Sequence, residues 1–141
     1  MDGLKERLRA AAEGRGDVPP IMSTLGMRLV KYSRGRATVS LDVDRRFYNP
    51  MGTVHGGIMT DLADASMGIA TTTTMAEDES FSTLELKMNF LRPVFEGKLT
   101  SSARVLHRGR TIAMADCVVR NEEGKAVARG TATQMILRPE K

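Results

Sequence analysis

One segment near the middle of this sequence has the pattern of a long helix, whereas the other regular segments of the core are typical of strands. From His55 to about Thr74, a helical wheel separates two faces of different polarity. The face expected to be buried carries Ile58, Met59, Leu62, Ser66, Ile69 and Ala70. The opposite side carries Asp61, Asp64 and Gly68. A helix of this kind needs a partner surface to cover its apolar face, and the remaining segments must provide that surface.

Alternating apolar and polar residues predict two strands before this helix and four after it. The expected strands are 27–32 and 36–43, then 82–90, 98–106, 110–119 and 126–136. Turn-like segments such as Ser33-Arg34-Gly35 separate them, and the Pro- and Gly-containing stretch 45–54 is expected to be a loop. These segments predict the α+β class, in which an antiparallel sheet carries its helix on one face.

The chain of 141 residues has the length of a single domain. We expect that domain to comprise residues 1–141, with a core over 27–137 and a short N-terminal helix within an extension over 1–18. The last strand places Ala126, Ala128, Gly130 and Ala132 on one face, which would let another backbone element approach closely. The long helix is the expected neighbour.

Composition excludes several classes of function. The formal charge of +4 comes from 21 basic and 17 acidic residues spread along the chain, which is unlike the basic stripe of a nucleic-acid binder. The charged N-terminus has the pattern of neither a signal peptide nor a membrane span, so a cytoplasmic protein is expected. The two His and the one Cys lack ligand spacing, so we expect no metal and no cofactor. Cys117 is expected to be a small buried residue.

The stretch 49–64 holds the residues that could perform chemistry. It is a polar, Gly-rich loop that runs directly into the helix carrying Asp61 and Asp64. Helix N-termini present N–H groups without intrahelical acceptors, together with a positive dipole end. An oxyanion could therefore bind at Gly56 or Gly57, where no side chain intervenes. Taken locally, however, a Gly-Gly pair is also an ordinary helix start, and an Asp opposite the apolar face is usually hydrated.

The spacing Asn-x-x-Gly-Thr-x-His-Gly-Gly-x-x-x-x-Leu-x-Asp over 49–64, followed by Leu-Lys-Met-Asn-Phe-Leu-Arg-Pro over 86–93, resembles a known family. It is similar to the hot-dog acyl-CoA thioesterases of the phenylacetic-acid-degradation (PaaI-like) type, over about residues 27–136. The resemblance implies a hot-dog fold, in which the sheet wraps around the central helix. It also implies at least a dimer, and a tetramer as a dimer of dimers, with each site between two subunits.

The resemblance assigns roles residue by residue. Asp64 matches the catalytic carboxylate, and Gly56 matches the backbone N–H that polarises the thioester carbonyl. Asn49 and His55 match polar residues that order the loop and the reacting groups. Thr83 stands where some relatives have a Ser that orients the hydrolytic water. Asp64 could attack directly to form an anhydride or act as a general base on water, and the sequence leaves both open.

Further residues are expected to contact the substrate. The small or apolar neighbours of Asp64, among them Met67 and Gly68, would leave room for an acyl group and raise the pKa of the carboxylate by desolvation. Gly57 is the second backbone candidate. The turn 107–110 offers Arg108 and Arg110 as contacts for the phosphates of CoA, although such a turn is equally typical of a solvated hairpin.

The expected function is hydrolysis of small aryl-acyl or short- to medium-chain acyl-CoA thioesters, with acyl-CoA as substrate and neither nucleic acid nor membrane as partner. Two alternatives come from other classes. The first is a non-catalytic acyl-CoA-binding or sensor protein, which would not need a carboxylate beside the thioester. The second is a hot-dog hydratase or dehydratase. Those enzymes use an Asp/His arrangement that His55 does not match well. The sequence does not indicate the natural acyl group.

Overall fold

The computed structural model describes residues 3–16 and 18–140, so residues 1, 2, 17 and 141 of the predicted domain lie outside the described part. The element order is helix, short helix, two strands, one long helix and four strands. The helices are α1 (Gly3–Ala12), α2 (Pro20–Leu25) and α3 (Gly56–Thr72), with a 3-10 turn at Arg45–Phe47. The strands are β1 (Arg28–Ser33), β2 (Arg36–Val43), β3 (Ser80–Phe90), β4 (Gly97–Arg108), β5 (Ile112–Arg120) and β6 (Ala126–Leu137).

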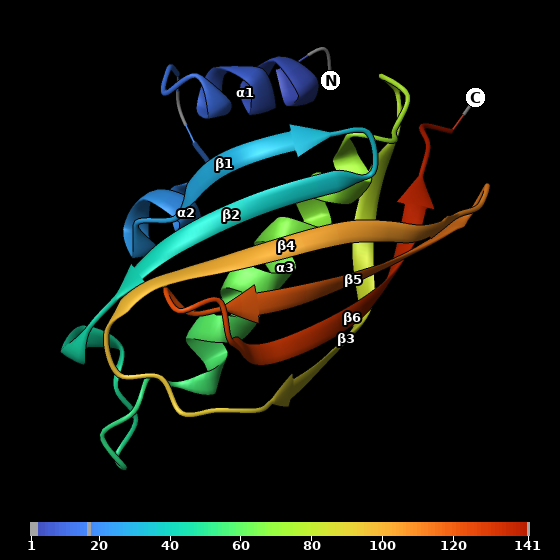
Figure 1. Cartoon of the computed structure of the whole chain (residues 1–141). Helices are drawn as coiled ribbons and strands as arrows, with labels where there is room; N and C mark the ends of the chain where they lie inside the picture. The colour runs from blue at the N-terminus through green and yellow to red at the C-terminus, as the bar shows by residue number, and fades with distance from the viewer. Residues whose placement is uncertain (1–2, 17, 141) are drawn as a thin grey trace.

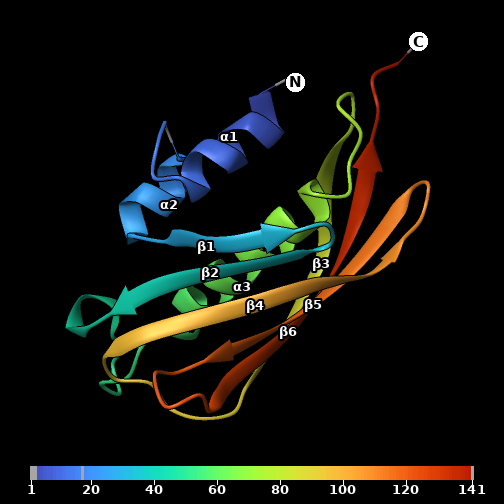
Figure 2. The same cartoon turned by 45° about the horizontal axis from the view of Figure 1, so that its top comes forward.

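The six strands form one antiparallel sheet in the order β1-β2-β4-β5-β6-β3. The sheet curves around α3, which lies on its concave side, and α1 runs beside the edge strand β1 (Figures 1 and 2). This arrangement confirms the predicted fold class and the six predicted strands. The observed ends of the strands differ from the predicted ends by two residues or fewer. Because β3 follows α3 and joins β6, the strand after the helix becomes the second edge.

The core lies between α3 and the sheet. Leu62 and Met67 of α3 are fully buried and meet fully buried strand residues such as Leu41, Leu99 and Val119. Each such side chain stabilises the fold by about 1.5–3 kcal/mol relative to full exposure. Cys117 is 2% exposed, as predicted, and burial raises the pKa of its thiol.

The long helix contacts β6 as expected, but the space at Gly130 is filled by side chains of the neighbouring strands. A Cβ at Gly130 would lie 2.6 Å from Met88 Sδ and 3.1 Å from Cys117 Sγ, on the two neighbouring strands. Gly130 therefore makes room for side chains of β3 and β5. The contact between β6 and α3 includes a buried hydrogen bond from the Thr71 hydroxyl to the Gln134 side-chain oxygen.

Helix α2 is an element that the sequence analysis missed. Pro20 occupies its first position, and Gly26 ends it with φ of 84°, a conformation that favours glycine. Both residues are standard helix boundary signals, but six residues are too few to show a helical period. None of the helices in the described residues combines the length and apolarity of a membrane crossing.

Candidate active site

The helix start at residues 55–57 leaves one N–H free for a ligand. His55 is the N-cap of α3, and its Nδ1 accepts the N–H of Gly57 at 2.9 Å. The N–H of Gly57 is therefore occupied, which argues against the predicted substrate contact through that group. In the described part of the chain, the N–H of Gly56 has no acceptor. The structure thus separates the two glycines, with Gly56 as the candidate oxyanion donor.

Asn49 fixes the loop that leads to this helix start. Its Oδ1 accepts the N–H groups of Met51 at 3.0 Å and Thr53 at 3.1 Å, while its Nδ2 donates to Thr53 Oγ1 at 2.9 Å. The N–H of His55 donates to the Phe47 carbonyl at 2.7 Å, which ties the loop to the 3-10 turn. Asn49 and Gly56 both line a cavity of about 350 Å³ whose opposite wall is formed by residues 90–94.

Asp64 lies farther along α3 and has no cationic partner. No ion pair to its carboxylate occurs among the described side chains. Partial burial raises the pKa of Asp64, the nearby charge of Asp61 raises it further, and a hydrogen bond from the Thr83 side chain lowers it. The carboxylate is thus more basic than an ordinary Asp, as a nucleophile or general base requires. Thr83 on β3 reaches Asp64 on α3 within a single chain.

Asp64 also lines the largest of the described cavities, with a volume of about 1020 Å³. Gly68, predicted as a substrate contact, lines the same cavity one helical turn later. Phe81 of β3 forms part of the wall, and a Cβ at Gly68 would lie 3.1 Å from its ring. Phe81 could not be predicted from the sequence, because its proximity to α3 depends on the strand order.

Met67 differs from Gly68 in its surroundings. It is fully buried in the core and does not line this cavity. The buried face of α3 is wider than the helical wheel indicated, since it also includes Ala63 and Thr71. In the single chain the Met67 side chain therefore packs in the core, and its contact with substrate stays a prediction.

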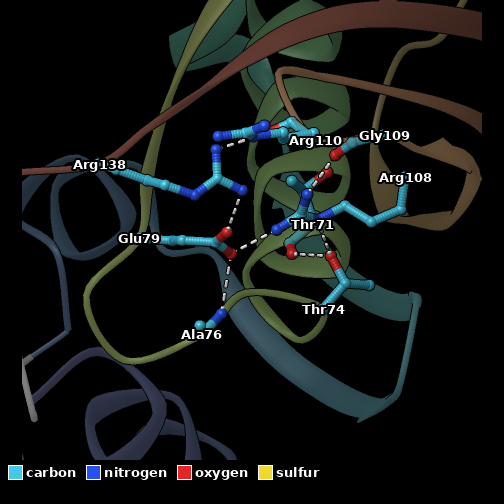
Figure 3. A network of polar contacts seen from close by, with 8 residues as sticks. All are labelled: Thr71, Thr74, Ala76, Glu79, Arg108, Gly109, Arg110 and Arg138. Carbon is cyan, nitrogen blue, oxygen red and sulfur yellow. Dashed lines mark hydrogen bonds and ion pairs between the residues drawn. The ribbon is translucent and has the colours of Figure 1, made fainter.

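Arg108 has polar partners within its own chain. Its guanidinium pairs with Glu79, and it also donates to Thr74 Oγ1 at 3.2 Å and to the Gly109 carbonyl (Figure 3). Glu79 is 7% exposed, and it receives a second guanidinium from Arg138 at 2.6 Å. This buried partner stands 29 residues earlier in the chain and engages the Arg108 guanidinium, so a CoA contact at Arg108 stays a prediction. The side chain of Arg110 remains exposed.

The Gly56 N–H and the Asp64 carboxylate, the two parts of the candidate site, lie far apart within one chain. Gly56 and Asp64 are eight residues apart on the same helix. At about 1.5 Å per residue, this spacing places them about 12 Å apart along the axis. Two groups at that separation cannot both contact one carbonyl.

The segments that carry Gly56 and Asp64 also match a known family. The sequence model of the thioesterase superfamily matches residues 51–128, which is more than half of the chain and includes both halves of the site. A Listeria monocytogenes protein named 1,4-dihydroxy-2-naphthoyl-CoA hydrolase is 26% identical over 121 residues, covering 86% of this chain and 98% of that protein.

Solved structures agree with the fold. A thioesterase family protein from Silicibacter pomeroyi superposes with a TM-score of 0.83 at 31% identity, covering 96% of this chain and 98% of the other. The E. coli PaaI protein of the phenylacetic acid degradation operon gives a TM-score of 0.82 at 25% identity, covering 97% and 96%. The fold and the family match define the class of thioester hydrolases. This chain belongs to the thioesterase superfamily and has its hot-dog fold, so the resemblance to the PaaI-like type is confirmed.

Proposed function

We propose that this protein hydrolyses acyl-CoA thioesters to a free acid and CoA, with Asp64 as the catalytic carboxylate. The observation that carries the proposal is an unpaired carboxylate of raised pKa that faces a large, mostly apolar cavity. The name of the Listeria relative as a CoA-thioester hydrolase supports CoA as the leaving group. Small aryl and short- to medium-chain acyl groups define the proposed substrate range.

The chemistry requires few groups. Asp64 either attacks the thioester carbonyl to form an anhydride, which water then cleaves, or removes a proton from a water that attacks the carbonyl. In both routes the C–S bond breaks and its electron pair leaves with the CoA sulfur as a thiolate. Thr83 would orient the carboxylate or the water, a role that its hydrogen bond to Asp64 supports. The free N–H of Gly56 would stabilise the oxyanion, a contribution of about 10²–10³ in rate for one donor.

We propose that these groups converge between two subunits. Since about 12 Å separates Gly56 from Asp64 in one chain, the N–H would come from one subunit and the carboxylate from its partner. The assembly is then a dimer at least, with a tetramer as the larger form. Asn49 and His55 would hold the loop that presents Gly56, through the hydrogen bonds they already make.

CoA phosphates need a cation outside the buried network. We propose Arg110 for this role, because it stands in the same turn as Arg108 but keeps its side chain exposed. We further propose a cytoplasmic location and no cofactor. Asp64, Thr83 and Gly56 together would supply the nucleophile or base, its orientation and the oxyanion donor that hydrolysis requires.

The proposal is tested by substituting each of the two carboxylates of α3 in turn. We expect Asp64→Asn to lower kcat/KM for hydrolysis of phenylacetyl-CoA and of butyryl-CoA by about 10²–10⁴. Asp61→Asn is the matched control, because Asp61 lies on the same helix and affects Asp64 only through its charge. Retention of wild-type turnover by Asp64→Asn would contradict the assignment. Binding of acyl-CoA without turnover in the wild-type protein would instead indicate a non-catalytic binder.

A further inference from the structure

The large cavity beside Asp64 has a second wall that comes from the N-terminal segment. One side consists of α3 with Phe81, and the other side consists of α1, residues 18–23 around the start of α2, and Leu29 of β1. Helix α1 runs beside the edge strand β1 in both views (Figures 1 and 2), and it contacts both β1 and α3. The N-terminal segment thus closes a space that would otherwise be an open groove along α3.

The cavity follows the length of α3. Asp64, Gly68 and Thr72 all line it, and their spacing of four residues places them along one face of the helix. From Asp64 to Thr72 the helix rises by about 12 Å, which equals the extended length of roughly ten carbon–carbon bonds. The cavity therefore begins at the catalytic carboxylate and continues toward the C-terminal end of α3.

Helix α1 lies near the far end of this space. Leu8 lines the large cavity and also shares a smaller surface cleft with Thr73, just beyond the end of α3. Ala11, which follows on the next turn of α1, lines the large cavity too and packs against the core. A bulky side chain at Ala11 would therefore reduce the volume of the cavity.

Phe81 limits the width of the cavity near Asp64. Its ring tip occupies the space that a side chain at position 68 would need, since a Cβ there would lie 3.1 Å from Phe81 Cζ. The absence of a side chain at Gly68 therefore lets the ring lie against the helix. Removal of the ring would widen the cavity at this point.

Building on the proposed function, we infer that the N-terminal segment and Phe81 enclose an acyl chamber that selects medium-length apolar acyl groups of about eight to ten carbons. Burial of each additional methylene favours binding by about fourfold, so catalytic efficiency rises with chain length until the chamber is full. A bulky side chain at Ala11 would reduce the space in the chamber, and loss of the Phe81 ring would enlarge it.

The test measures kcat/KM over acetyl-, butyryl-, hexanoyl-, octanoyl-, decanoyl- and palmitoyl-CoA. For the wild-type protein we expect efficiency to rise from acetyl to octanoyl or decanoyl and to fall for palmitoyl. Ala11→Trp is expected to lower the ratio of decanoyl to butyryl efficiency at least tenfold. Glu6→Trp is the matched control, because Glu6 is exposed on the same helix and lies outside the cavity. This control should keep the wild-type ratio.

A second variant covers the case in which Ala11→Trp does not fold. Phe81→Leu is expected to move the preferred length or bulk upward, with a higher ratio of palmitoyl to octanoyl efficiency. An unchanged chain-length profile in folded Ala11→Trp, or in Phe81→Leu, would overturn the inference. A wild-type kcat/KM that does not change with chain length would also overturn the inference. If butyryl-CoA is still hydrolysed in an Asp64-dependent way, the proposed function survives that failure, whereas hydrolysis of no acyl-CoA at all would reject both.

Discussion

Two carboxylates of this protein, Glu79 and Asp64, have opposite electrostatic surroundings. Glu79 is 7% exposed, yet its pKa is lowered by a hydrogen bond from the Ala76 N–H and by Arg108 and Arg138. Asp64 is more exposed in the single chain, yet its pKa is raised by partial burial and by Asp61. At Glu79 the Ala76 N–H and the guanidinium partners outweigh the effect of burial on the pKa, whereas at Asp64 burial has the larger effect. A carboxylate with two guanidinium partners is held in place, whereas one without them stays basic and available for reaction.

The largest difference between these carboxylates is expected in stability. Glu79→Gln removes a charged acceptor that joins the α3–β3 loop to the β4–β5 turn and the C-terminal segment (Figure 3). We expect the free energy of unfolding to fall by about 2 kcal/mol, as measured by chemical denaturation. Asp64→Asn should not lower it at neutral pH. Equal destabilisation by Glu79→Gln and Asp64→Asn would contradict the expected difference between the two carboxylates.

The pH dependence of stability should differ in sign between the two groups. Folding lowers the pKa of Glu79, so its contribution is present above the unfolded pKa and is lost as pH falls through the folded pKa. Folding raises the pKa of Asp64, so the ionised group disfavours folding as pH rises through the folded pKa. At neutral pH, Asn at position 64 should therefore be neutral or stabilising and Gln at position 79 destabilising. In thermal unfolding experiments, the difference in Tm between each variant and the wild-type protein should shrink as the pH is lowered.

A smaller effect is expected from the charge of Asp61. Since that charge raises the pKa of Asp64, Asp61→Asn should move the acid limb of the kcat/KM profile to lower pH. Turnover at neutral pH should stay near the wild-type value. An acid limb that does not move would show that a different group controls the rate in acid.

The smallest effect is expected from Thr83. Its hydrogen bond lowers the pKa of Asp64, so Thr83→Val should move the same acid limb upward. Thr83→Ser, which keeps the hydroxyl, is the matched control and should restore the wild-type profile. A shift in Thr83→Ser as large as that in Thr83→Val would assign the effect to packing.

The sequence predicted the strands well, since each combines alternation with a turn signal such as Gly35 or Gly124, both at positive φ. It also predicted the long helix and its polar side. What it could not supply were pairings that depend on the strand order. Thr83 meets Asp64 only because β3 returns to the sheet edge beside β6, and Arg108 meets Glu79 only across the folded chain. The burial of Met67 was not evident either, because a helical wheel does not show how wide the buried face is.

The proposed convergence of Gly56 and Asp64 from two subunits can be tested by a specific substitution at Gly56. Gly56 is the first residue of α3, where proline is well tolerated, and His55 before it has φ of −60° and ψ of 135°, which suits a residue that precedes proline. Gly56→Pro therefore deletes the N–H while keeping the helix. Gly56→Ala is the control, since it adds the same contact with the exposed Phe90 ring but keeps the donor.

The most direct measurement is activity after subunit exchange between Asp64→Asn and Gly56→Pro proteins, each inactive alone. In a mixed dimer, one shared site carries both substitutions and the other carries neither. With random exchange, half of the dimers are mixed and each has one intact site, so a shared site should restore about a quarter of wild-type activity. No recovery, with mixed dimers verified by native mass spectrometry, would contradict a site shared between subunits.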